Sequence, residues 1–239
     1  MKRTLFLTLT MVMCIGNAHA FKYEPAEGLT WMGFFGMNVS TIQNHEYKAK
    51  AGATLGVKAD YMLPSAHGTY LTAAFGWTMK GGKKSCEATV DNMSYDGTGK
   101  YVLHYLELPV RIGFRYNIRE NFGLYAEVGP YFAVGVGGKH KLSIDGDGSD
   151  IGDAEDDGSF CAFKKSDNTE RQTFQRWDAG VGFRLGAELN NHYNLLIGAD
   201  WGLADIYRDS LRDAYFDKYK KRLPKAHNFI FNITLGYRF

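Results

Sequence analysis

The sequence is poor in proline and cysteine, and beyond its first twenty residues it has no long apolar run. Five of 239 residues are proline and three are cysteine. Scarce proline suits long paired strands, because proline cannot donate a hydrogen bond to a sheet ladder. The missing apolar runs exclude membrane-spanning helices, which need about 20 consecutive apolar residues. They do not exclude membrane-spanning strands, whose apolar residues alternate with polar ones.

The first twenty residues form a targeting segment. MKRTLFLTLTMVMCIGNAHA begins with basic Lys2 and Arg3, continues with an apolar stretch and ends with small residues before a cleavage point after Ala20. This pattern predicts a cleaved secretory signal peptide over residues 1–20 and leaves residues 21–239 as one domain. Without Lys2 and Arg3 the number of basic residues equals that of the 26 acidic residues. That balance gives no indication of a nucleic-acid partner.

Enzyme signatures are also absent. The sequence contains no GxSxG, HExxH or CxxC motif. The nearest pairing of serine with histidine, Ser65 and His67, lies in a predicted short turn, where a catalytic triad has no basis. We therefore predict that the protein is not an enzyme and uses no cofactor.

Strict alternation of apolar and polar residues dominates the rest of the chain. In WDAGVGFRLGAEL (Trp177–Leu189) one side of the pattern is entirely apolar, and the other is glycine or charged. A period of two residues predicts β-strands. Seven further segments follow the pattern, the first of them more weakly: Thr30–Ser40, Leu55–Tyr61, Leu71–Lys80, Leu106–Tyr116, Leu124–Val136, Tyr193–Leu203 and Phe229–Phe239.

The connections between these eight segments alternate between short and long. The long ones, or predicted loops, are residues 41–51, 81–100, 138–174 and 205–227. Short turns at one rim and long loops at the other are typical of outer-membrane barrels. We predict an all-β, eight-stranded, antiparallel up-and-down transmembrane β-barrel in the outer membrane of a Gram-negative bacterium. Its N- and C-termini would then be periplasmic and its long loops extracellular.

The apolar side of the strands would face lipid in such a barrel, whereas in a secreted soluble barrel it would face inward. Aromatic residues concentrate near the strand ends, as in the interfacial girdles of membrane proteins. The opposite side is rich in glycine and in charges of both signs. Both features favour the membrane barrel.

Six basic and six acidic residues lie on the polar side and would face the lumen. Eight strands leave an interior just wide enough for side chains to fill, and an unpaired buried charge is costly. We predict that these charges pair and fill the lumen, with a selective channel as the alternative. The residues are Lys58, Lys80, Arg111, Arg115, Arg184, Arg238, Asp60, Glu107, Glu127, Asp178, Glu188 and Asp200.

Four stretches are distinctive: YLELPVRIGFRY, FGLYAEVGPYFAVGVGG, GLADIY and the closing ITLGYRF. Together they resemble the PorT-type family of outer-membrane β-barrels. The resemblance implies an outer-membrane location and eight strands, and it implies little about activity, although one branch is linked to the assembly of a secretion system. In such barrels an aromatic-ended last strand is also the insertion signal read by the barrel-assembly machinery. That role would fall on Leu235, Tyr237 and Phe239.

Two predicted loops carry opposite charge. Oxygen ligands at short spacing suit Ca²⁺, so DGDGSDIGDAEDD in the third loop is a weak calcium candidate, although it departs from the EF-hand pattern. A solvated acidic loop is the alternative. The candidate ligands are Asp145, Asp147, Asp150, Asp153 and Glu155.

The fourth loop is basic and has apolar residues at helical spacing, which predicts a short helix over residues 208–221. It would bind lipopolysaccharide phosphates or a partner, or it would pair with the acidic loop. Cys86 and Cys161 fall in the second and third loops, and we predict a disulfide between them in an oxidising compartment.

The sequence thus favours an outer-membrane barrel with a side-chain-filled interior. It would act in envelope structure, or contact a ligand or partner through its loops. The alternatives are a small porin or a transport- or secretion-associated component and, more weakly, a barrel enzyme acting on lipid. The expected partners are outer-membrane lipid, lipopolysaccharide and the assembly machinery, and the sequence does not identify an extracellular ligand.

Overall fold

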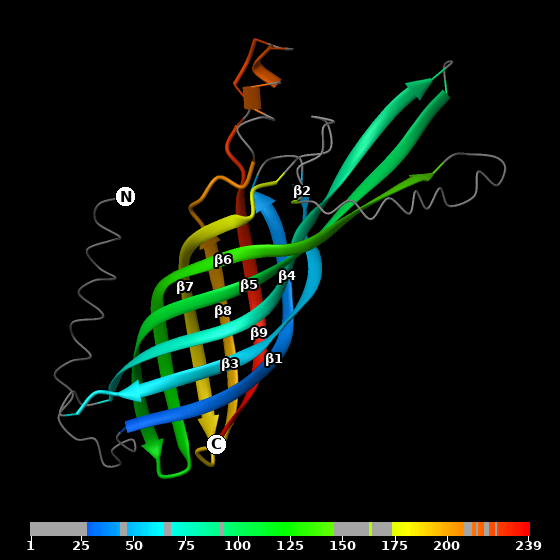
Figure 1. Ribbon diagram of the computed structural model, residues 1–239. Helices are drawn as coiled ribbons and strands as arrows, with labels where there is room; N and C mark the ends of the chain where they lie inside the picture. Colours follow the sequence, from blue (N-terminus) through cyan, green and yellow to red (C-terminus); the bar gives the residue numbers. More distant parts are fainter. Residues whose placement is uncertain are drawn as a thin grey trace, which may run out of the picture.

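Eight strands close into a ring in the computed structural model (Figure 1). The structure describes residues 28–43, 47–64, 68–90, 93–145, 163, 174–207, 212–213, 215–217, 220–222 and 224–239, and of 86–90, 93–98 and 139–145 it describes the backbone alone. The predicted signal peptide lies outside these residues. The strands are β1 (Gly28–Gln43), β2 (Tyr47–Lys48), β3 (Lys50–Met62), β4 (Thr69–Val90), β5 (Met93–Arg119), β6 (Phe122–Asp145), β7 (Trp177–Leu189), β8 (Tyr193–Gly202) and β9 (His227–Arg238).

All neighbours in the ring are antiparallel and, apart from β1 and β9, follow one another around the barrel, with β2 as a two-residue addition to β4. The last strand pairs with the first, from Gln43↔His227 to Met32↔Arg238. This pairing closes the sheet and leaves no edge between the first and last strands. The predicted eight-stranded antiparallel up-and-down barrel is confirmed.

The two ends of the barrel differ in their connections. One end, called the turn end, holds the C-terminus and short turns such as Glu120–Asn121 and residues 190–192 (Figure 1). Asn190 and Asn191 have φ values of 52° and 60°, a left-handed conformation that asparagine adopts more readily than most residues. The opposite end, called the loop end, holds the longer connections.

The strands run further at the loop end than the alternation predicts. β4 and β5 stay paired from Gly81↔Val102 out to Val90↔Met93, so the loop predicted over residues 81–100 is a long hairpin that projects from the barrel (Figure 1). β1, β3 and β6 likewise extend into the predicted loops at 41–51 and 138–174. Backbone pairing needs no apolar and polar alternation where a sheet has no buried face, so the sequence pattern ends before the strands do.

Apolar side chains cover the outside of the ring. Trp177 is 71% exposed and Phe35 is 64% exposed, and outward positions on every strand of the ring are apolar in the same way. The inward positions are buried and mostly polar. No helix in the described part of the chain is long and apolar enough to cross a membrane.

Candidate functional site

The lumen of the barrel is the candidate site, because the buried charges of the molecule converge there. Inward positions of all eight ring strands contribute to it, and strand alternation places them there automatically. From the turn end to the loop end the lumen contains four successive groups of side chains and then an apolar layer.

The group nearest the turn end is a four-residue ion cluster. Arg115 lies 3.7 Å from Asp60 and 3.5 Å from Glu188. Arg238, the penultimate residue, lies 3.3 Å from Asp60 and 2.6 Å from Glu188. Each arginine therefore contacts both acids, and the cluster joins β3, β5, β7 and β9 across the lumen.

Lys58 connects this cluster to the next group. Its ammonium lies 3.2 Å from Asp60 and also forms a short ion pair with Glu127. The Tyr70 hydroxyl donates to Glu127 at 2.7 Å. The rings of Tyr70 and Tyr125 fit into the lumen because glycines face them. A Cβ on Gly113 would lie 2.3 Å from the Tyr70 ring, and one on Gly186 would lie 2.1 Å from the Tyr125 ring.

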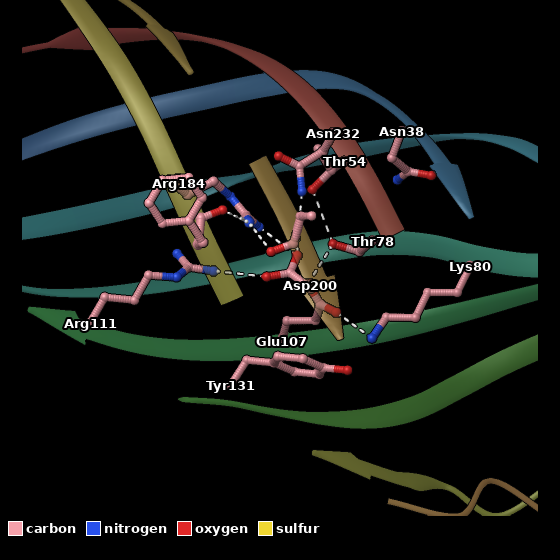
Figure 2. A network of polar contacts seen from close by, with 12 residues as sticks. Asn38, Thr54, Thr78, Lys80, Glu107, Arg111, Tyr131, Arg184, Asp200 and Asn232 are labelled. Carbon is pink, nitrogen blue, oxygen red and sulfur yellow. Dashed lines mark hydrogen bonds and ion pairs between the residues drawn. The ribbon is translucent and has the colours of Figure 1, made fainter. Parts of the chain in front are cut away.

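Asp200 is the centre of the third group (Figure 2). Arg184 donates to its Oδ2 at 2.5 Å, and Arg111 donates to its Oδ1 at 3.4 Å. Asn232 donates to the same carboxylate at 3.3 Å. Two arginines thus share one acid, and Arg184 also donates to the carbonyls of Phe183 and Ala199.

Lys80 is the centre of the fourth group, in which acidic residues outnumber basic ones. Its fully buried ammonium lies 2.5 Å from Glu107 and 2.8 Å from Asp178, so one cation contacts two acids. The rings of Tyr105 and Tyr131 lie 4.8 and 4.6 Å from the same ammonium. The excess negative charge here offsets the excess positive charge around Asp200, so the charges of the four groups sum to zero.

A cavity of about 50 Å³ lies between these groups, lined by Arg111, Arg184, Asp200, Glu107 and Lys58 among others. Its volume suffices for a few water molecules. Asn38 Oδ1, Asn232 Oδ1 and Glu127 Oε2, which belong to lining residues, have no hydrogen-bond partner among the described residues. The cavity is therefore suited to bound water.

An apolar layer, called the cap, closes the lumen at the loop end. Phe174 and Tyr207, which come from two different long connections, stack with ring centres 6.0 Å apart. The buried residues of the cap are Ile42, Leu103, Tyr105, Tyr131, Ala133, Phe163, Phe174, Ile206, Tyr207 and Ala226. Sequence analysis missed the cap, because several of its members lie in connections without any periodic pattern. The aromatic character of Phe174 and Tyr207 was the one available signal.

The structure brings together all twelve charged residues that the sequence places in the lumen, and each forms at least one ion pair. Leu235, Tyr237 and Phe239 lie on the outer face and are exposed. The Cys86 side chain and Cys161 lie outside the described residues, as do the candidate calcium ligands apart from the backbone of Asp145. Residues 212–213 and 215–217, within the predicted helix, are helical.

A closed ring with an apolar exterior and a charged, paired interior defines a membrane β-barrel, since a soluble barrel would place its apolar side inward. Residues 19–208 match the model of the outer membrane protein beta-barrel domain. The chain belongs to this family and is an outer-membrane protein.

Several solved outer-membrane proteins are similar to it. The attachment invasion locus protein Ail of Yersinia pestis is 14% identical, with 90% of this chain and 100% of that chain covered and a TM-score of 0.38. Neisserial surface protein A is 10% identical, with 89% of this chain and 100% of that chain covered and a TM-score of 0.43. OprG from Pseudomonas aeruginosa is 13% identical, with 90% of this chain and 98% of that chain covered and a TM-score of 0.41. At these identities the likeness concerns the fold alone. None of the curated proteins matches the sequence.

Proposed function

We propose that the protein is a non-conducting outer-membrane barrel that acts in envelope structure, or in contact with a ligand or partner at its loop end. In this proposal the turn end faces the periplasm and the loop end faces outward. Outer-membrane lipid and lipopolysaccharide surround the barrel, and the barrel-assembly machinery reads the last strand during insertion. The proposal includes membership of the PorT-type family, which the stretches YLELPVRIGFRY and FGLYAEVGPYFAVGVGG support.

The observation that carries the proposal is the ion pairing of all twelve charged residues in the four groups of the lumen. An ion that entered would meet arginines and lysines already bound to acids from opposite strands. Opening a path would separate buried pairs such as Arg238 and Glu188, at 2.6 Å, or Lys80 and Asp178, at 2.8 Å. Separating such pairs is costly, because each partner is left as an uncompensated buried charge.

A small channel is the second candidate, and the 50 Å³ cavity is the observation in its favour. The cavity does not connect the two ends by itself, because the cap lies on one side and the cluster of Arg115, Arg238, Asp60 and Glu188 on the other. Enzyme activity on lipid is not proposed, because no observation on the described residues favours it.

Ion flux from vesicles tests the proposal. Purified protein is reconstituted into vesicles loaded with potassium, and efflux is followed with an electrode over a range of protein-to-lipid ratios. We expect efflux at the rate of protein-free vesicles at every ratio. Efflux that rises in proportion to the amount of protein would show an open path and favour the channel.

A further inference from the structure

A row of lysines crosses four neighbouring strands at the loop end. Lys48 of β2 is directly opposite Lys83 of β4, Lys83 is opposite Lys100 of β5, and Lys100 is opposite Lys141 of β6. Adjacent strands lie about 4.8 Å apart, so this lysine row places a lysine backbone position roughly every 5 Å. Like charges directly opposite each other destabilise a sheet. An anionic partner bound along the row would offset this repulsion.

Lys48, Lys83 and Lys100 of the row lie on the outer face of the sheet. Tyr47 and Tyr101 pack against the cap inside the barrel. Lys48 and Lys100 are their next neighbours in the chain, and successive side chains of a strand point to opposite faces. Lys48, Lys83 and Lys100 are exposed. Within the part of the chain that the structure describes, no ion pair involves any of the three.

The position of the lysine row relative to the apolar band of the barrel can be derived from β5. Its outward apolar positions run from Leu106 to Tyr116, and ten residues at about 3.3 Å each, tilted by about 40°, span about 25 Å, the height of the apolar band of such barrels. Lys100 lies six residues beyond Leu106 on the loop side. It is therefore outside the hydrocarbon region, in the polar layer of the membrane, and long lysine side chains reach back toward the interface.

A buried neighbour adds to the local excess of positive charge. Lys50, the first residue of β3, is 4% exposed, and its ammonium donates only to the carbonyl of Ala51, at 3.2 Å. The positive charges of Lys100 and Lys83 act on it as well. No carboxylate of the described residues pairs with Lys50, so among these residues several cations of this corner lack a counter-charge.

We propose that the lysine row binds phosphate groups of lipopolysaccharide in the outer leaflet. Phosphates are the anions that a surface at this height would meet along the barrel wall, and a row of ammonium groups suits several of them at once. The inference rests on the proposed function only in placing the loop end outward; it does not depend on whether the lumen conducts. The acidic segment at residues 145–157 is the competing partner.

Lipid binding is measured with the full chain in detergent micelles, titrated with diphosphorylated lipid A. The test variant is Lys48→Gln, Lys83→Gln, Lys100→Gln. The control is Arg119→Gln, which removes an exposed positive charge at the turn end that forms no ion pair among the described residues, and the single variant Lys100→Gln is its match in charge. Each lysine near an anionic surface is worth about fivefold in affinity, so the test variant should bind roughly a hundredfold more weakly and the control nearly as well as the native protein.

Two further arms separate the possible sources of the anion. Dephosphorylated lipid A should bind native protein and test variant equally weakly, and inorganic pyrophosphate at the same concentration should not compete. Equal binding of both lipids, or affinity lost in the control but not in the test variant, would overturn the proposal. Full competition by pyrophosphate would assign the row to a free anion and overturn it too.

Thermal unfolding in lipid-free detergent tests the competing partner and the folding of the variant together. If the row is unpaired within the chain, removing its mutually repelling charges should raise the melting temperature above that of native protein. A lower melting temperature would mean that the acidic segment already neutralises the row, and it would contradict the proposal. Potassium efflux, measured in parallel, keeps this outcome distinct from a failure of the non-conducting barrel.

Discussion

At the scale of single residues, Asp200 is the acid on which the burial of two lumen arginines depends. It is bound by Arg184, Arg111 and Asn232 from three other strands, and it is 3% exposed. The two arginines have no other carboxylate within ion-pair distance among the described residues. Their joint burial therefore depends on this one acid.

We predict that Asp200→Asn destabilises the barrel by about 3–5 kcal/mol, because it leaves two buried guanidinium groups without a counter-charge. Urea unfolding in micelles, followed by tryptophan fluorescence, measures the change. Asp217→Asn is the control: Asp217 is exposed and its pair with Lys220 spans 4.0 Å, so the effect should stay below about 0.5 kcal/mol. Equal effects of the two substitutions would mean that the lumen pairs do not hold the fold.

Two glycines of the barrel strands provide a second test for single residues. A Cβ added at Gly186 would lie 2.1 Å from the Tyr125 ring, whereas one added at Gly137 would have no neighbour within 4 Å. Overpacking costs typically about 1–3 kcal/mol, so we predict a loss of that size for Gly186→Ala and almost none for Gly137→Ala in the same unfolding experiment. Tolerance of alanine at Gly186 would show that the lumen is loosely packed.

Single elements show what the sequence could predict and what it could not. Alternation in stretches such as Trp177–Leu189 was sufficient to find the eight strands and to assign their faces, because one face is entirely apolar. The hairpin over residues 81–100 escaped prediction, since it has no buried face to impose a pattern. Register is also absent from local sequence, so alternation could place Arg238 in the lumen but could not indicate that Glu188 lies 2.6 Å away.

The projecting hairpin should be dispensable for the barrel. Beyond the Lys84↔Gly99 pair its strands contact each other and, on one side, the end of β6. We predict that replacing residues 85–98 by an Asn-Gly turn leaves the shift between boiled and unboiled protein on a gel intact, and changes the unfolding free energy by less than about 1 kcal/mol. A shortened protein that migrates identically in both states would show that the hairpin is needed for closure.

At the scale of the whole molecule, the lumen is filled in a fixed sequence of layers. Ion clusters of balanced total charge occupy the turn end and the middle, and the apolar cap closes the loop end. Neither layer alone would decide between a channel and a closed barrel, since a polar lumen can conduct. Together they place paired charge and apolar rings in series along any path through the ring.

Single-channel recording tests this closed lumen most directly. Purified protein is inserted into a planar bilayer in molar potassium chloride, and insertion is verified independently by protease protection on vesicles from the same preparation. We predict a current at the level of the bare bilayer, without steady open steps at moderate voltage. Reproducible, long-lived steps of uniform size would contradict the account and show that the paired charges line a working channel.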